Sequence, residues 1–169
     1  MSTIERLVSS ESFDAMVVSI CFWVILYVVV KLITVHAGVG NLLKNGDKRI
    51  AKLRKAVMHM RMLCTSRGAK KNLAKSVKVL DDVIKYEKKA TRVLTMYLFD
   101  DRNDFDVAQA RNLVKSIPDA CREALVKLAD KQTDDLGERF DKMLEDLKTA
   151  RELLKKADML DKKKELLRM

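Results

Sequence analysis

Proline and glycine are scarce in this 169-residue chain, which holds one Pro, at position 118, and five Gly. Aromatic residues make up 5% of the sequence. Tight turns depend on Gly and Pro, and large β cores are usually rich in aromatics, so these shortages argue against a β-sandwich or a β-barrel. They also exclude collagen-like and Pro/Gly-rich disordered chains. With 48% hydrophobic and 34% charged residues, the composition predicts an all-α protein.

Residues that carry metal or catalytic chemistry are few and widely spaced. The three Cys residues form no CxxC pair, and His36 and His59 are separated by 22 residues without a neighbouring thiol. Neither a GxxxxGK[ST] nor a GxGxxG phosphate loop occurs. The stretch DDRNDFD at 100–106 lacks the central Gly and the twelfth-position Glu of a calcium-binding EF-hand loop. We therefore expect no metal site, no cofactor, no catalytic residue and no enzymatic activity.

A long apolar segment lies near the N-terminus. Residues 15–35 read AMVVSICFWVILYVVVKLITV and contain one charge, Lys31. About 20 apolar residues cross a bilayer as a helix, and the absence of water in hydrocarbon forces the backbone to pair within that helix. The preceding residues carry one Arg and three acids, unlike a cleaved signal or a transit peptide. We predict a short N-terminal segment over 1–14 and an uncleaved transmembrane anchor over 15–37.

Basic residues near the two ends of this anchor predict its orientation. Arg6 lies upstream, whereas Lys31, Lys44 and five more basic residues up to Lys55 lie downstream. Because Lys and Arg are retained on the cytoplasmic side, we expect a single-pass protein with its N-terminus outside. A hinge over 38–47 then leads into a cytoplasmic helical body over 48–169.

Polar and aromatic residues follow one side of the predicted anchor. At about 100° per residue they occupy an arc of roughly 120°. Such a row can hydrogen-bond or pack against a second helix in the bilayer, so we predict a partner helix there. Chance placement combined with interfacial aromatics is the alternative. The row consists of Ser19, Trp23, Tyr27, Lys31, Thr34 and Gly38.

Apolar spacing of three and four residues predicts several helices in the body. A turn signal at 45–47, with Asp47 as the N-cap, precedes a helix that ends near Cys64. A long helix is expected over about 70–99, and a turn with a capping Asp over 100–104.

A shorter helix is then expected over 105–116, with Pro118 in the first turn of the next one. A weak interruption falls near 133–135, and the chain after Lys162 should fray.

A heptad-like apolar row distinguishes the C-terminal third of the chain. Three repeats are the lower limit for a coiled coil, and an antiparallel intramolecular bundle explains the same spacing with fewer assumptions. We therefore predict an antiparallel helical bundle with coiled-coil-like C-terminal helices. The row contains Leu136, Phe140, Met143, Leu147 and Leu154.

The positive charge of the chain is concentrated in one stretch. The chain carries a net +10, yet residues 44–92 alone hold 16 basic and 4 acidic side chains, a net +12. A basic stretch beside a membrane anchor attracts anionic lipid headgroups. Nucleic acid is a less favoured partner because aromatic residues for base stacking are sparse. The expected contact residues are Lys44, Lys48, Arg49, Lys52, Arg54, Lys55, Arg61, Arg67, Lys70 and Lys71.

These features support two functional hypotheses. The first is a membrane-anchored structural or adaptor subunit that joins other protein subunits, as a homo- or hetero-oligomer, through helix–helix contacts. The second is a module that binds anionic lipid headgroups through its basic juxtamembrane helices.

Overall fold

The computed structural model describes the backbone of residues 3–99 and 104–167, and the side chains of these residues except at 3–14, 33–37, 39, 70 and 165. Every element in these ranges is a helix, so the predicted all-α class is confirmed. The chain divides into two compact units, residues 1–37 and 38–169.

The first unit is formed by helix α1, Thr3–Ala37, which also includes most of the predicted N-terminal segment. Within it, Ala15–Leu32 has a mean hydropathy of 2.4, and none of its side chains is buried within the chain. Eighteen residues at about 1.5 Å each span about 27 Å, close to the thickness of a hydrocarbon core. This helix is therefore long and apolar enough to cross a membrane.

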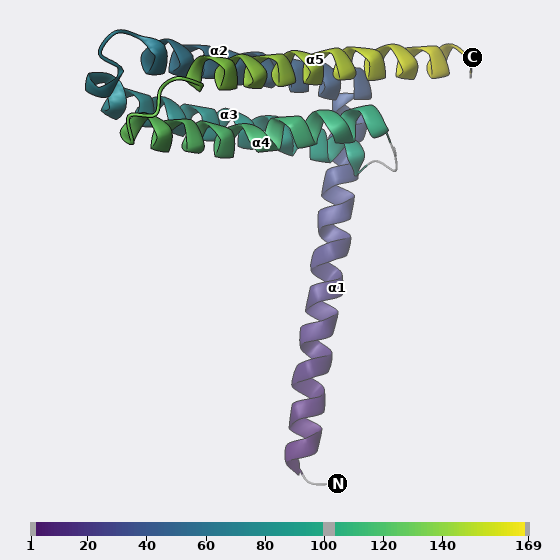
Figure 1. Ribbon diagram of the computed structural model, residues 1–169. Coiled ribbons are helices and arrows are strands. Elements are labelled where there is room, and N and C mark those ends of the chain that lie inside the picture. The colour runs from purple at the N-terminus through teal and green to yellow at the C-terminus, as the bar shows by residue number, and fades with distance from the viewer. Residues whose placement is uncertain (1–2, 100–103, 168–169) are drawn as a thin grey trace. The chain divides into compact units, whose positions relative to one another are not determined.

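The second unit is a four-helix bundle. Its helices are α2 (Val39–Thr65), α3 (Leu73–Leu98), α4 (Phe105–Ala129) and α5 (Leu136–Leu166), with a short 3₁₀ helix, η1 (Ala69–Asn72), before α3. Helices α2 and α4 each pack against both α3 and α5 (Figure 1). Short connections between consecutive helices make neighbours antiparallel, and the predicted antiparallel bundle is confirmed.

Apolar stripes from all four helices meet in one core. Ile50 and Leu53 come from α2, Leu94 from α3, and Ile117 and Leu128 from α4, and each is at most 1% exposed. The predicted heptad-like row of α5 is buried in the same core, which explains its spacing without an intermolecular coiled coil. Its buried members are Leu136, Phe140, Met143, Leu147 and Leu154.

The predicted turn at 45–47 is wrong, because these residues lie inside α2. The stretch expected as a hinge, 38–47, is helical from Val39 onward, and the helix break falls at Gly38, whose φ is 61°. Gly46 lies where three helices converge, and a Cβ there would stand 3.2 Å from both Leu94 and Leu154. Asp47 does not cap a helix.

The predicted helix boundary before Pro118 is also wrong. Helix α4 continues through this residue, which is buried in the helix interior. A proline at such a position costs about 3 kcal/mol. The apolar spacing of α4 continues unbroken from Val114 through Ile117 to Cys121, and burial of this stripe outweighs the loss of one hydrogen bond.

The structure tests three further local predictions. Asp104 is the N-cap of α4 and accepts a hydrogen bond from the Asp106 N–H at 2.9 Å; the rest of the predicted turn, 100–103, lies outside the described residues. The interruption predicted near 133–135 is confirmed as part of the turn between α4 and α5. The residues expected to fray, from Lys162 onward, are helical as far as Leu166.

Candidate interaction surfaces

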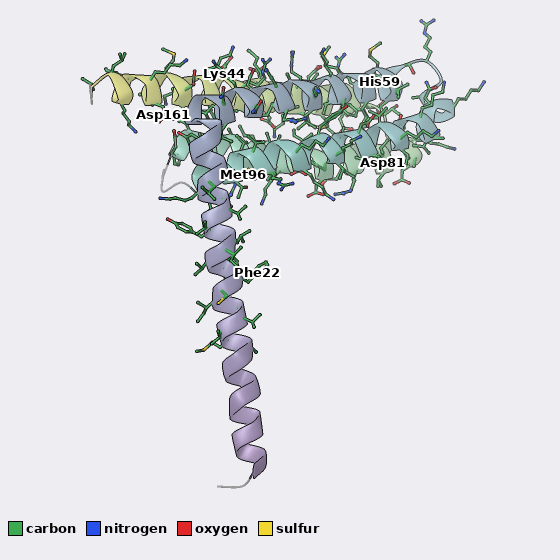
Figure 2. All side chains as sticks on the ribbon, turned by 180° about the vertical axis from the view of Figure 1, so that it is seen from behind. Phe22, Lys44, His59, Asp81, Met96 and Asp161 are labelled. Atoms are coloured by element: carbon green, nitrogen blue, oxygen red, sulfur yellow. The ribbon has the colours of Figure 1, made fainter. Side chains whose placement is uncertain are left out.

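The two helices that carry most of the net positive charge lie next to each other. Figure 2 shows α2 and α3 side by side, with Lys44 and His59 labelled on α2 and Asp81 and Met96 on α3. Their outward side chains form what we call the basic face. It contains the exposed residues Lys44, Lys48, Lys52 and Lys55 of α2 and Lys75, Lys78, Lys85, Lys88, Lys89 and Arg92 of α3.

The two halves of the bundle differ in how far their positive charges are paired with acidic side chains. Residues 39–99 hold 16 basic and 4 acidic side chains, whereas residues 104–167 hold 14 basic and 15 acidic ones. In the described part of the chain, ion pairs such as Lys127–Asp135, Arg139–Asp135 and Lys156–Asp106 join charges within the second half. No residue of the basic face takes part in an ion pair among the described residues.

Among the described side chains, two ion pairs connect the halves. The Arg151 guanidinium of α5 donates to both Asp47 carboxylate oxygens of α2, at 2.6 and 3.0 Å. Asp47 raises the pKa of Arg151 through this hydrogen bonding. Arg61 of α2 pairs with Asp141 of α5 at 3.0 Å. These contacts neutralise one acid and one base of the α2–α3 half and fix α2 against α5.

Most of the predicted anionic-surface residues reach solvent. Four α2 lysines belong to the basic face, and Arg67 and Lys71 are exposed at the α2–α3 connection. Arg49 and Arg54 are half-buried, whereas Arg61 is paired as described. Lys70 belongs to η1, and its side chain lies outside the described residues.

The α3 members of the basic face were missing from the predicted contact residues. The sequence did contain a signal for them, because the stretch with a net charge of +12, residues 44–92, includes the basic residues of α3 up to Arg92. Only the packing of α3 beside α2 shows that these charges share one side of the bundle.

A partly open groove of about 370 Å³ lies along the outer side of α2. Lys48, Lys52 and Lys55 line it together with Arg49, Asn45 and Ala51. Ammonium and guanidinium groups around such a groove can hold carboxylate or phosphate oxygens by charge-assisted hydrogen bonds. The groove is open to solvent, which suits an extended anionic surface better than an enclosed small molecule.

The predicted polar row of α1 is exposed where the structure describes it. Trp23 and Tyr27 are 60% and 44% exposed, and the Lys31 ammonium lies 5.6 Å from the centre of the Tyr27 ring. The Thr34 side chain lies outside the described residues. Gly38 follows the end of α1 with a positive φ, so it does not continue the helical row. Ser19 is exposed, and the row therefore extends from Ser19 to Lys31 in the described side chains.

Of the three free Cys residues, Cys21 of α1 is exposed, whereas Cys64 and Cys121 are buried in the bundle. Burial raises the pKa of the Cys121 thiol to about 12, and it also raises the pKa of Cys64. Cys64 lies 3.8 Å from the Ser76 hydroxyl, and Cys121 lies 3.6 Å from the Met143 sulfur. Thiols held protonated in this way pack as small apolar side chains.

No cluster of three or more His, Cys, Asp or Glu side chains that could hold a metal ion occurs among the described residues. No protein-family model, curated protein or solved structure matches this chain.

Proposed function

We propose that this chain is a membrane-anchored structural adaptor rather than an enzyme. In this proposal, α1 holds the chain in a bilayer and the bundle presents its basic face to an acidic surface of another subunit of a membrane-associated assembly. The apolar side chains of Ala15–Leu32, which none of the described residues covers, support the anchoring. The heptad-like row of α5 is used inside the bundle, so it does not supply the contact to a partner.

The segregation of charge is the observation that carries this proposal. Like charges three or four residues apart destabilise a helix by about 0.2–0.5 kcal/mol per pair. Lys48 and Lys52 have this spacing on α2, as do Lys85 and Lys88 on α3. The α4–α5 half shows that this scaffold can balance its charges. The uncompensated face of α2 and α3 therefore indicates a partner of opposite charge, which would also accelerate association.

Comparison of two charge variants tests the proposed face. Full-length protein is extracted in mild detergent, its native mass is measured, and the proteins that co-purify are identified. The triple variant Lys48→Gln, Lys52→Gln and Lys55→Gln should lose a partner that the unmodified chain retains. A matched control, Lys115→Gln, Lys131→Gln and Lys142→Gln, removes the same charge from exposed positions of the other half and should retain it. Equal retention by both variants would refute the basic face as the binding surface.

The polar row of α1 provides a second contact for the same adaptor function. Side chains able to hydrogen-bond within hydrocarbon stabilise helix pairs, by about 1–2 kcal/mol in model peptides. A variant with Ser19→Leu, Tyr27→Leu and Lys31→Leu should lower the oligomeric state of the full-length chain in detergent. A control with Val18→Leu, Ile25→Leu and Val29→Leu, on other sides of α1, should leave the native mass unchanged. Monomers in the unmodified protein would contradict a homo-oligomeric contact at this row.

Anionic lipid headgroups are the alternative ligand of the basic face. Lysine predominates over arginine in residues 39–99, by 11 to 5. A Lys ammonium acts as a compact point charge and lacks the bidentate geometry of arginine, which suits a diffuse headgroup layer. The bundle, residues 38–169, is a compact unit with its own core, so we expect it to fold without α1. Binding to vesicles that contain phosphatidylserine, lost in the α2 lysine variant and at high salt, would favour this function over a protein partner.

A further inference from the structure

The last turns of α5 expose apolar side chains that the bundle does not use. Figure 1 shows α5 extending past the ends of the other bundle helices. We call residues 158–167 the α5 tip. Its Met159, Leu160, Leu166 and Leu167 are 71%, 44%, 74% and 78% exposed.

The α5 tip is amphipathic in a specific direction. Asp161 faces the bundle, where its Oδ2 accepts a hydrogen bond from the Tyr97 hydroxyl at 2.8 Å. At about 100° per residue, the four exposed apolar residues fall within an arc of about 120° on the side opposite Asp161. Lys163 lies within this arc, with Lys162 and Lys164 on its flanks. Helices that lie at a membrane interface combine apolar side chains with lysines whose ammonium groups reach the headgroups, and the α5 tip has both, with Lys163 near the middle of the arc.

The first residue of the α5 tip, Asp158, lies beside the start of α2. A Cβ at Gly40 would stand 3.5 Å from the Asp158 carboxylate, and a groove of about 270 Å³ is lined by Leu43 and Lys44 of α2 and by Leu154, Lys155 and Asp158 of α5. Val39, where α2 begins, follows the end of the apolar window by seven residues. Seven residues reach at most about 25 Å. Chain length alone therefore keeps this end of the bundle near any bilayer that holds α1.

Two aromatic side chains add to the same end of the bundle. Phe99 follows α3 and Phe105 begins α4, and they are 48% and 76% exposed. The Tyr97 hydroxyl, which bonds to Asp161, also lies 3.4 Å from the Asp104 carboxylate that caps α4. Six of the ten large hydrophobic side chains exposed on the described part of the bundle thus gather at this end. Large apolar side chains are therefore exposed more often at this end than elsewhere on the described bundle.

We propose that the α5 tip docks into the interfacial layer of the bilayer that holds α1, as a second membrane contact. This inference rests on the anchoring part of the proposed function. Leu160, Leu166 and Leu167 enter the boundary between headgroups and acyl chains, and Lys162–Lys164 contact anionic headgroups. This contact would restrict rotation of the bundle about the helix break at Gly38, and it would thereby determine which way the basic face points.

Fluorescence quenching by lipids tests this docking in the full-length chain. Trp23 is the sole tryptophan, so the unmodified protein reports on α1, whereas a Trp23→Phe, Leu166→Trp variant reports on the α5 tip. The matched control, Trp23→Phe with Val126→Trp, places the probe at an exposed site of α4 near its opposite end. Each protein is reconstituted into vesicles of phosphatidylserine and phosphatidylcholine with brominated acyl chains. We expect loss of emission for the probes at positions 23 and 166, and no loss for the probe at position 126.

The outcomes separate the two proposals. Without quenching of Trp23, the anchoring proposal fails and this inference fails with it. With Trp23 quenched, a position-166 probe that brominated lipid leaves bright overturns the docking alone. Acrylamide then shows whether that probe is in water or covered by a protein, including a second copy of the chain. Replacing Lys162, Lys163 and Lys164 with Gln should decrease the quenching at position 166 and leave the quenching of Trp23 unchanged.

Discussion

The α2–α3 and α4–α5 halves of the bundle contribute to one core but differ in surface charge: the first is strongly basic and the second is nearly neutral. Both supply fully buried side chains, such as Leu53 from α2 and Phe140 from α5. Residues 39–99 carry a net +12, whereas residues 104–167 carry a net −1 and contain most of the ion pairs of the described chain.

This difference shows that packing and surface charge are specified separately. The apolar stripes bring the halves together, because burial of large side chains contributes about 1.5–3 kcal/mol each. Exposed charges contribute far less, since water and salt screen them. The surface charge of α2 and α3 can therefore serve binding with little effect on the fold.

The shared core gives the largest expected effects. Phe140→Ala should decrease the free energy of unfolding by about 3–5 kcal/mol and Leu53→Ala by about 2–5 kcal/mol, through lost burial and cavity formation. Urea unfolding of residues 38–169, followed by circular dichroism, measures both. Met62→Ala, at a 67% exposed position of α2, is the control and should change it by less than about 0.5 kcal/mol. Separate transitions for the two halves would contradict a common core.

Gly46 tests the close approach of α2 to α3 and α5. Gly46→Leu should cost about 1–3 kcal/mol, because Leu94 and Leu154 already stand 3.2 Å from the position of a Cβ. Gly137 has open space around its Cβ position, so Gly137→Leu should leave stability unchanged or increase it by up to about 1 kcal/mol. Thermal unfolding of the two variants provides the comparison. A stable Gly46→Leu protein would show that the three helices can separate at this point.

Gly46 also shows where prediction from sequence reaches its limit. The order Asn45-Gly46-Asp47 is a typical turn signal, yet this glycine serves contact between helices that are distant in the sequence. Pro118 was misassigned for the same reason, since a local rule was outweighed by a continuous buried stripe. The α5 row was predicted correctly because its spacing directly reflects burial.

The interaction surfaces were predictable only in part. The charge count of 44–92 indicated a basic surface, but its shape depends on α2 packing beside α3. The sequence favours fraying from Lys162 onward, because it does not show that the preceding Asp161 bonds to Tyr97 of another helix. In the structure α5 continues as a helix to Leu166, and Leu166 and Leu167 are exposed.

The Asp47–Arg151 pair tests how strongly a charge contact joins the halves. Both side chains are about one-third exposed or less, and two hydrogen bonds connect them. A double-mutant cycle with Asp47→Ala and Arg151→Ala should give a coupling of about 1 kcal/mol. The control cycle, Glu145→Ala with Lys148→Ala, addresses a more exposed pair within α5 and should give about 0.3–0.5 kcal/mol. Equal couplings would show that the connection adds nothing beyond a surface pair.

Removing lysines from the basic face should change stability in the opposite direction. Replacing Lys48, Lys52 and Lys55 with Gln relieves like-charge pairs and should stabilise the bundle by about 0.5 kcal/mol at low salt. The gain should disappear near 1 M salt, where screening is nearly complete. The variant with Lys115, Lys131 and Lys142 replaced by Gln should show no such gain, because its half carries balanced charge. Urea midpoints at two salt concentrations distinguish the variants. An equal gain in stability for both variants would contradict the proposed difference in charge repulsion between the halves.

The smallest expected effect concerns Asp135, in the turn between α4 and α5. Hydrogen bonds from Lys127 and Arg139 lower the pKa of Asp135 from 3.8 to about 2. Because the folded state binds this proton less readily than the unfolded state, the stabilisation is complete above pH 3.8 and is lost as the pH falls through about 2. Asp135→Asn should therefore decrease the midpoint temperature slightly at pH 7, and the difference from the unmodified bundle should vanish towards pH 2. Asp134→Asn, at an exposed neighbour outside these contacts, should have no effect at either pH. A constant difference at all pH values would mean that the Asp135 side chain acts through the shape of the turn rather than through its charge.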